Sequence, residues 1–408
     1  MRESRSTGLG RPFWTLLSSS GLSNLADGIF KLALPLVAIA YTRSPALVAG
    51  LELVRTLPWL LGALPVGALS DRIDRKRSMV AANATRGILV AIAAGFIVAG
   101  SGSIWLLYAI ALGTGIAEVF YDTASQSILP SVVSRSNLDR ANGRLFAVEL
   151  GAQEFAGPPI AGLLVGVGLA LSFATSAGLW ILAIVALIVM RGNFRPQRTG
   201  STTTIMADIR EGLTFVYRRP VLRNLALMVG MSNLASSAVF SVFVLFAVGP
   251  DSEMGLTEPG FGILFAVIAA GGVLGGVMAE YVQQRLGQAR SLTISVFGTI
   301  ACVSVPVLTS DALPIGAVFL IGGMTIMIWN VITVSYRQRV TPDHLLGRVN
   351  SAYRLLAWGT RPLGAALGGM VGEWVGVRGV FVVMGAFTLG LLIPNRTITE
   401  DSLAAGAQ

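Results

Sequence analysis

Long apolar segments, each separated from the next by a short polar stretch, follow one another along almost the whole chain. A hydrocarbon core about 30 Å thick requires roughly 20 apolar residues in each helix that crosses it. The pattern therefore predicts an all-α membrane protein with twelve transmembrane helices. We expect these helices at residues 13–41, 46–70, 78–99, 103–128, 142–168, 171–190, 221–249, 260–284, 290–309, 312–336, 351–375 and 377–394.

The composition agrees with a chain that lies mostly in a lipid bilayer. Of the 408 residues, 53% are hydrophobic and 12% are charged, and the mean hydropathy is +0.71. A soluble domain carries about 25% charged residues. The 48 glycines suit helices that pack closely in a membrane. The single cysteine, Cys302, excludes a disulfide within the chain and is expected to pack as a small hydrophobic residue.

The distribution of basic residues predicts how the helices are oriented. The 30 lysines and arginines concentrate in alternate loops, and the opposite loops contain only Arg43 and Arg378. By the positive-inside rule we expect both termini in the cytoplasm, and hence a multi-pass protein of a bacterial-type cytoplasmic (inner) membrane. Because the net charge of +9 is spread over membrane loops rather than over one face, nucleic acid is excluded as a partner.

One long polar stretch, residues 191–220, divides the chain. It begins as a linker, and residues 205–216 have the amphipathic pattern of a helix that lies on a membrane surface. We therefore expect three parts. They are an N-terminal six-helix bundle in residues 1–192, a cytoplasmic linker with an amphipathic helix in residues 193–220, and a C-terminal six-helix bundle in residues 221–408.

Short sequences recur at equivalent places in the two halves. Three such matches at nearly the same spacing favour an internal duplication, and hence two bundles related by pseudo-two-fold symmetry. The matches are S-N-L-A at 23–26 and 232–235, G-A-L-S-D at 67–71 with a degenerate echo G-V-M-A-E at 276–280, and R-A-N at 140–142 with R-V-N at 348–350.

A compact charged loop at residues 67–77, G-A-L-S-D-R-I-D-R-K-R, stands between two apolar segments. It resembles the signature loop between helices 2 and 3 of the major facilitator superfamily, which has the form G-x-L-(S/A)-D-R-x-x-R-(K/R). The resemblance implies a secondary transporter. It also implies a cytoplasmic gate, a charge relay of Asp71, Arg72, Arg75 and Asp122 that locks one state. Alternatively, these charges serve only to fix the topology.

The fifth apolar segment contains a second recognisable sequence. Gly157, Pro158 and Gly162 belong to G-P-P-I-A-G, which resembles the helix-5 antiporter motif G-P-x-x-G-G that is characteristic of exporters. Ala161 replaces the first glycine of the final pair, so the match is incomplete. The alternative is an ordinary packing helix that the prolines bend.

Carboxylates inside the apolar segments are candidates for proton coupling, because an ionisable group in a bilayer costs about a few kcal/mol. Asp27 and Lys31 are one helical turn apart and form either a proton-dependent ion pair or a static one. Glu118 and Glu154 have no local cation on their own helices, which favours proton exchange, and Glu149 is a further candidate. Four arginines on other helices are candidate partners, and the sequence leaves open which of them pair: Arg55, Arg86, Arg354 and Arg361.

Further phrases resemble the subgroup that contains macrolide-efflux and enterobactin-exporter proteins, among them E-G-L-T-F at 211–215 and P-D-H-L-L-G-R-V-N at 342–350. The resemblance implies a monomer that exports bulky, partly hydrophobic small molecules in exchange for protons, without a cofactor. A dedicated siderophore or metabolite exporter, or a non-transporting membrane sensor with the same fold, is the alternative. By the same resemblance helices 1, 4, 7 and 10 line the substrate cavity. The candidate lining residues are Phe30, Tyr121, Asn233, Phe240, Trp329 and Asn330.

The sequence offers little for catalysis or metal binding. It contains no phosphate-binding loop of the form G-x-x-x-x-G-K-(S/T), which argues against a pump driven by its own ATPase. One histidine, His344, and one cysteine make a metal site or a nucleophilic triad a poor interpretation. We expect neither an enzyme nor a metalloprotein.

Overall fold

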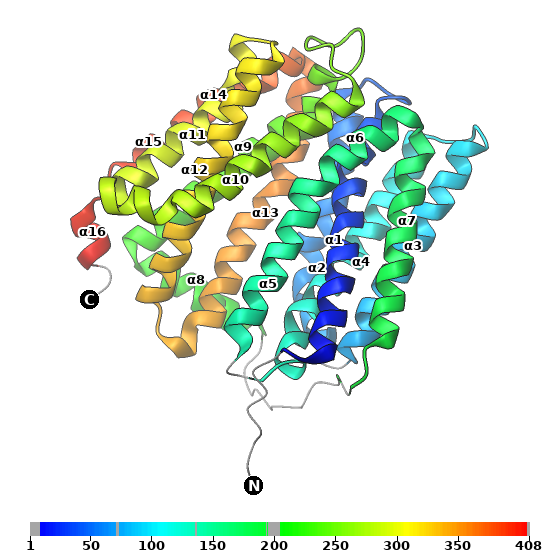
Figure 1. The fold of residues 1–408 in the computed structure, drawn as a ribbon. Coiled ribbons are helices and arrows are strands. Elements are labelled where there is room, and N and C mark those ends of the chain that lie inside the picture. The colour runs from blue at the N-terminus through cyan, green and yellow to red at the C-terminus, as the bar shows by residue number, and fades with distance from the viewer. Residues whose placement is uncertain (1–8, 71–72, 135–136, 193, 195–204, 406–408) are drawn as a thin grey trace. The chain divides into compact units, whose positions relative to one another are not determined.

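The computed structural model describes residues 9–70, 73–134, 137–192, 194 and 205–405. The regular secondary structure of this part is helical, apart from one isolated bridge between Val248 and Leu256. Figure 1 shows the helices in chain order. The elements are α1 (Gly10–Ala38), α2 (Pro45–Ser70), α3 (Arg75–Val98), α4 (Ile104–Ile128), the 3-10 turn η1 (Leu129–Ser131), α5 (Leu138–Leu150), the π-helical segment η3 (Gly151–Ala156), α6 (Gly157–Val167), α7 (Leu169–Val189), α8 (Ile205–Arg218), α9 (Pro220–Ala247), α10 (Glu258–Leu286), α11 (Gln288–Leu308), α12 (Ala312–Val340), α13 (Asp343–Val375), α14 (Val377–Leu389), α15 (Leu392–Asn395) and α16 (Glu400–Ala405).

The twelve membrane-crossing segments that the hydrophobic pattern predicts are present in the described part of the chain. The fifth of them consists of α5, η3 and α6 in direct succession. Nine helices among the described residues are each long and apolar enough to cross a membrane. Some helices continue past their predicted ends: α12 runs to Val340 and α13 begins at Asp343, because the polar residues there are still good helix formers.

The chain groups into two compact units. One consists of residues 1–41 and 57–200, and the other of residues 42–56 and 201–408. The inclusion of residues 42–56 in the second unit was not expected from the sequence. It follows from packing on α13, where a Cβ atom on Gly369 would lie 3.1 Å from the Ala46 Cα atom. Glu373 also accepts a hydrogen bond of 2.7 Å from the Ser44 hydroxyl.

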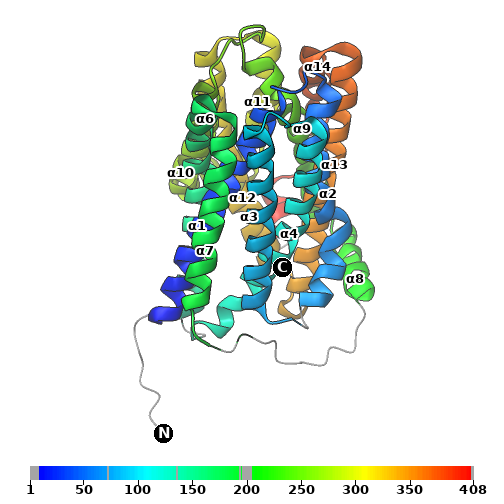
Figure 2. The same ribbon diagram turned by 90° about the vertical axis from the view of Figure 1, so that its right-hand side faces the viewer.

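In the first unit α7 packs against both α1 and α3, and α3 also packs against α4. Figures 1 and 2 show α1, α3 and α7 side by side. Phe13, Phe173 and Trp180 are completely buried and fill the space between these helices. The Ser19 hydroxyl donates a hydrogen bond of 2.9 Å to the Ala183 carbonyl oxygen, which joins α1 to α7. This packing fixes the face of α1 from which the charged side chains described below project.

In the second unit α9 packs against α13, α10 packs against α12, and α11 packs against α12 and α14. Glycines allow close approaches between these helices: a Cβ atom on Gly364 of α13 would lie 2.2 Å from the Leu234 carbonyl oxygen of α9, and a Cβ atom on Gly271 of α10 would lie 2.0 Å from the Leu320 carbonyl oxygen of α12. Aromatic rings fill the core between α9, α12 and α14, with Phe243 at 5.6 Å from Phe319 and Phe246 at 5.1 Å from Phe381 between ring centroids.

The amphipathic helix α8 docks on α13 (Figure 2). Glu211 of α8 forms an ion pair with Arg348 of α13. A Cβ atom on Gly212 would lie 2.3 Å from the Arg348 carbonyl oxygen, so only glycine allows this approach. The two phrases at 211–215 and 342–350, which resemble the exporter subgroup, therefore contact each other. The sequence predicted only that this helix lies on the membrane surface, and it did not indicate that the helix packs on α13.

Candidate functional site

Charged side chains from three helices meet in the first unit. Arg86 of α3 donates from Nη1 to both carboxylate oxygens of Asp27 on α1, at 2.7 and 2.8 Å. One turn along α1, the Lys31 Nζ atom lies 3.1 Å from Glu118 Oε1 on α4. The exposed fractions of Asp27, Arg86 and Glu118 are 6%, 1% and 8%, so this group is buried. We refer to these four residues as the ionic cluster.

The ionic cluster corrects one expectation. The i,i+4 spacing of Asp27 and Lys31 suggested that they pair with each other, but each forms its ion pair with a residue of a neighbouring helix. Helix packing brings the guanidinium of Arg86 between α1 and α4, where it occupies the position that Lys31 was expected to take. The sequence named Arg86 only as one of several possible partners.

Arg86 is held by rings as well as by charge. Its guanidinium carbon lies 4.6 Å from the ring centroid of Tyr121 and 5.5 Å from that of Trp180. Its Nε and Nη2 atoms are buried and have no hydrogen-bond partner among the described residues. The charges of Glu118 and Asp122 also act on it. Arg86 is thus bound directly to one carboxylate and attracted by two more. When Asp27 is neutralised, Arg86 can therefore interact more strongly with Glu118 and Asp122.

Two of the four predicted gate residues, Asp71 and Arg72, lie outside the described residues. The backbone N–H of Arg75 donates to the Phe194 carbonyl oxygen at 3.4 Å, and no ion pair joins Arg75 to Asp122 in the described part of the chain. The charged groups that act on Asp122 include Glu118, Arg86, Asp27 and Lys31. Asp122 therefore belongs electrostatically with the ionic cluster, and the gate itself stays a prediction.

The helix-5 motif packs directly beside the ionic cluster. A Cβ atom on Gly157 would lie 2.7 Å from the Cα atom of Gly28, the residue that follows Asp27. A Cβ atom on Gly28 would in turn lie 2.3 Å from the Gln153 carbonyl oxygen. Pro158 and Gly162 of the motif are buried in α6. The preceding segment η3 is π-helical, a local widening that is frequent at functional sites and that no residue pattern had indicated.

The two remaining candidate carboxylates lie on this broken helix but differ in environment. Glu149 is partly buried and accepts a hydrogen bond of 3.1 Å from the Ser20 hydroxyl of α1. Glu154 is exposed and accepts a hydrogen bond of 3.1 Å from the neighbouring Gln153 amide. Glu154 belongs to the π-helical segment η3, none of whose residues is buried, and its role in proton coupling stays a prediction.

The second unit contains a cavity of about 400 Å³ between α9, α11, α12 and α13. Its volume lies within the range of about 300–1,000 Å³ that is usual for small-molecule sites. Asn233, Trp329 and Asn330, three of the six candidates, line it, and the Asn233 amide is fixed by a hydrogen bond of 2.6 Å to the Ala357 carbonyl oxygen. We call this space the second-unit cavity.

Two arginines also line the second-unit cavity. Arg337 donates a hydrogen bond of 2.8 Å to Asn350 and lies 4.2 Å from the ring centroid of Tyr353. Arg361, in the middle of α13, lies 5.2 Å from the ring centroid of Trp358. No aspartate or glutamate is among the described residues that line the cavity. The sequence signal that could have found Arg361 was its position inside an apolar segment.

The other three candidate lining residues serve packing. Phe30 is 3% exposed and contacts Phe173 and Trp180, with ring centroids 5.6 and 6.1 Å apart. Tyr121 lies under the Arg86 guanidinium. Phe240 belongs to the aromatic core, with ring centroids 5.7 Å from those of both Phe265 and Phe319. A large aromatic residue in an apolar helix gains more from such contacts than from facing an aqueous cavity.

Twelve membrane-crossing segments in two units, with buried charges in both units, define a polytopic membrane transporter rather than an enzyme. Residues 16–360 match the model of the Major Facilitator Superfamily, and the chain belongs to this superfamily. The charged loop and the internal repeat had indicated the same family.

Proteins of known name and structure agree with this assignment. The chain is 28% identical over 391 residues to the multidrug efflux pump Tap of Mycobacterium tuberculosis, an alignment that covers 91% of this chain and 88% of Tap. It is 26% identical over 327 residues to the enterobactin exporter EntS of Salmonella choleraesuis, covering 76% and 74% of the two chains.

Solved structures share the fold at lower identity. The nucleoside transporter NupG aligns with a TM-score of 0.74 at 11% identity, over 95% of this chain and 99% of NupG. A bacterial homologue of the iron transporter ferroportin, in an inward-facing state, aligns with a TM-score of 0.71 at 18% identity, over 98% and 99% of the chains.

Proposed function

We propose that this protein is a secondary active exporter that exchanges protons for bulky, partly hydrophobic small molecules by alternating access. The observation that carries the proposal is the buried Asp27–Arg86 ion pair beside the helix-5 glycine Gly157. The similarity to the multidrug efflux pump Tap supports the direction of transport. The similarity to EntS favours a dedicated siderophore or metabolite exporter as the second candidate.

The chemistry of proton coupling follows from the ionic cluster. A proton on Asp27 removes the charge that holds Arg86, whose attraction then falls on Glu118 and Asp122 of α4. The forces between α1, α3 and α4 change with it, and α1 packs on the helix-5 motif through Gly28. A ligand shifts a conformational equilibrium only by binding its two states with different affinity. The proton meets this condition if Asp27 binds it more tightly in the state in which Arg86 interacts with Glu118 and Asp122 of α4 than in the state in which Arg86 pairs with Asp27.

Substrate binding belongs to the second-unit cavity in this proposal. The rings of Trp329 and Trp358 offer flat apolar surfaces, while Asn233, Asn330 and Arg361 offer polar atoms. Because no carboxylate lines this cavity among the described residues, a substrate does not displace a proton from a shared acid there. Proton and substrate are instead coupled through the conformational equilibrium. The two arginines that line this cavity, Arg337 and Arg361, favour substrates that carry an anionic or strongly accepting group.

The remaining features of the proposal rest on the sequence. Both termini lie in the cytoplasm, as the distribution of basic residues predicts, and the protein works as a monomer in a bacterial-type cytoplasmic membrane. Asp71, Arg72, Arg75 and Asp122 form the cytoplasmic gate. Partly desolvated ion pairs at the edge of a helix bundle are suited to bias a two-state equilibrium.

The test is proton movement in proteoliposomes under an imposed pH gradient, recorded with an internal pH dye while macrolides, tetracyclines, dyes and siderophores are added one at a time. We expect one chemical class to trigger proton flux in the wild type and in the control Glu253→Gln, which changes an exposed carboxylate outside the spans. Asp27→Asn should abolish the flux. Full flux in Asp27→Asn would remove Asp27 from the coupling mechanism, and silence across the panel would favour the sensor or a dedicated exporter.

A further inference from the structure

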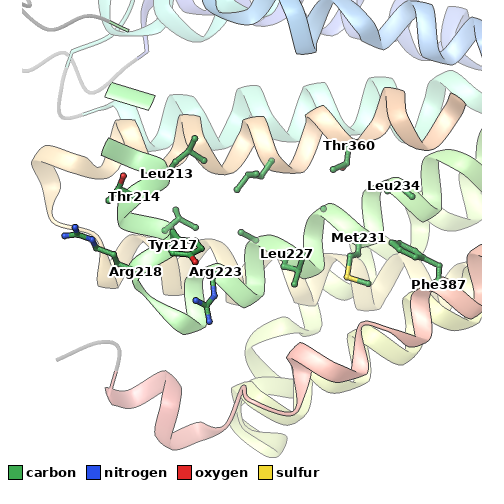
Figure 3. Close-up of a pocket in the computed structure, with 14 residues that line it drawn as sticks. Leu213, Thr214, Tyr217, Arg218, Arg223, Leu227, Met231, Leu234, Thr360 and Phe387 are labelled. Carbon is green, nitrogen blue, oxygen red and sulfur yellow. The ribbon is translucent and has the colours of Figure 1, made fainter. Parts of the chain in front are cut away.

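A second cavity of the second unit, about 610 Å³ in volume, lies between α8, α9, α13 and α14. Figure 3 shows that its residues follow α9, with Arg218 and Arg223 at one end and Leu234 and Phe387 at the other. Between these ends the lining is almost entirely apolar. The cavity is thus basic at one end and hydrophobic along the rest of its length. We call it the α8 groove.

The length of the α8 groove matches one leaflet of a membrane. Leu234 lies eleven positions after Arg223 on α9, which corresponds to a rise of about 16 Å at about 1.5 Å per residue. The hydrocarbon core of a bilayer is about 30 Å thick, so each leaflet contributes about half of that. The basic end lies where α8, an amphipathic helix, meets the start of α9. An arginine pair at the interface and an apolar channel one leaflet deep have the proportions of a single phospholipid.

The walls of the α8 groove are open to the surroundings, while its floor is closed. Leu227, Leu356 and Phe387 are exposed at 53%, 38% and 37%. Val216 and Ala226 beneath them are exposed at 3% and 4%. Apolar side chains that surround a cavity on the outside of a membrane protein are in contact with lipid chains. The hollow holds one such chain more firmly than a convex helix surface would.

The two arginines at the mouth of the α8 groove are available to a ligand. Both are exposed, and neither forms an ion pair with a carboxylate in the part of the chain that the structure describes. Arg223 lies 5.5 Å from the ring centroid of Tyr217, which limits where its guanidinium can point. By contrast, the neighbouring Arg219 donates a hydrogen bond of 3.0 Å to the Val340 carbonyl oxygen. Guanidinium groups are well suited to bind phosphate oxygens.

We propose that the α8 groove binds an anionic glycerophospholipid. Its headgroup phosphate lies between Arg218 and Arg223, and one acyl chain follows Leu227, Met231 and Phe387. Basic pockets at the membrane surface recognise anionic headgroups in this way. The proposal does not depend on which substrate is transported or on proton coupling. None of these residues belongs to the ionic cluster or lines the second-unit cavity, although both cavities are lined by other residues of α9 and α13.

The test uses the purified full-length protein in detergent and counts bound lipids by native mass spectrometry. Phosphatidylglycerol and phosphatidylcholine with identical acyl chains are compared. We expect the wild type to bind phosphatidylglycerol roughly tenfold more tightly, and Arg218→Gln with Arg223→Gln to lose this preference. The control Arg285→Gln with Arg290→Gln removes two exposed arginines elsewhere and should keep it. Leu227→Asn should weaken the binding of both lipids.

A second measurement locates the lipid. Phosphatidylglycerol with a photoreactive group in its acyl chain should label peptides of α9 or α14 in the wild type and in the control, and much less in the double variant at the groove. Equal binding of the two lipids by the wild type, an unchanged preference in the double variant, or labelling elsewhere would overturn the proposal. So would displacement of the lipid by a transported drug, which would make the groove a substrate site, or its closure by a second copy of the chain.

Discussion

Gly28 and Gly157 lie so close together that a Cβ atom on Gly157 would be 2.7 Å from the Cα atom of Gly28. Gly28 follows Asp27, and Gly157 begins the motif that resembles the antiporter signature. The fifth span is therefore in backbone contact with α1 at the ionic cluster. A movement of either helix has to displace the other, since neither backbone has room to yield.

Replacing Gly157 with alanine should damage both stability and transport. The new methyl group meets backbone atoms rather than a flexible side chain, so the helices have to separate, at a cost of about 1–3 kcal/mol. We expect a lower midpoint of thermal unfolding in detergent and a marked loss of substrate-driven proton flux. Gly151→Ala, on the same span but with no atom within 4 Å of its Cβ, is the matched control and should behave like the wild type. Equal effects of the two substitutions would contradict this account.

The Asp27–Arg86 pair should show strong thermodynamic coupling. Removing one partner of a buried ion pair leaves the other charge unpaired and costs about 3–5 kcal/mol. Asp27→Asn should therefore destabilise the protein strongly, because Arg86 is 1% exposed. Adding Arg86→Gln should restore part of the stability without restoring proton flux. Unfolding measured for both single variants and the double variant checks this, and strictly additive effects would show that the pair does not act as a unit.

Glu118 and Glu154 should differ in their importance although both were candidates. Glu118 is 8% exposed and pairs with Lys31 at 3.1 Å, whereas Glu154 is exposed and bonded to its neighbour Gln153. Glu118→Gln should reduce substrate-driven proton flux by about tenfold or more, because a positioned side chain that transfers a proton contributes at least that factor to the rate. Glu154→Gln should leave the flux near the wild-type level. The reverse order in vesicle assays would place the proton path along the fifth span instead.

The positions of the helices could be predicted from the sequence, because crossing a bilayer requires apolar runs that nothing else in the chain imitates. The partners of the charged residues could not. A helix shows which residues share its face, such as Asp27 and Lys31, but the residue that faces them from another helix depends on rotation and packing. Arg86 reaches Asp27 across that gap. The docking of α8 on α13 could not be predicted either, because the apolar face of an amphipathic helix can pack on a bilayer or on another helix.

The candidate lining residues show a similar division. Asn233 and Asn330 line the second-unit cavity, and their role in binding a substrate stays a prediction. Phe30 and Phe240 contact other aromatic rings, and an aromatic residue in an apolar segment carries no polar group that would demand a cavity. Arg361 was overlooked in this role, although a cation in the middle of a span is the more informative feature.

Arg361 should decide which substrates the second-unit cavity accepts. Its guanidinium lies over Trp358, and among the described residues no carboxylate lines the same cavity to neutralise it. A hydrogen bond to a charged group contributes about 1.5–3 kcal/mol, equivalent to roughly ten- to a hundredfold in affinity. Arg361→Gln should weaken the transport of anionic or acceptor-rich substrates by that factor, and Arg361→Lys should recover part of it.

Transport of cationic substrates and the proton flux that they drive should persist in Arg361→Gln. Arg339→Gln, which removes an exposed arginine at the end of α12, is the control for loss of charge alone. An equal loss for anionic and cationic substrates would mean that Arg361 holds α13 in place rather than selecting the substrate.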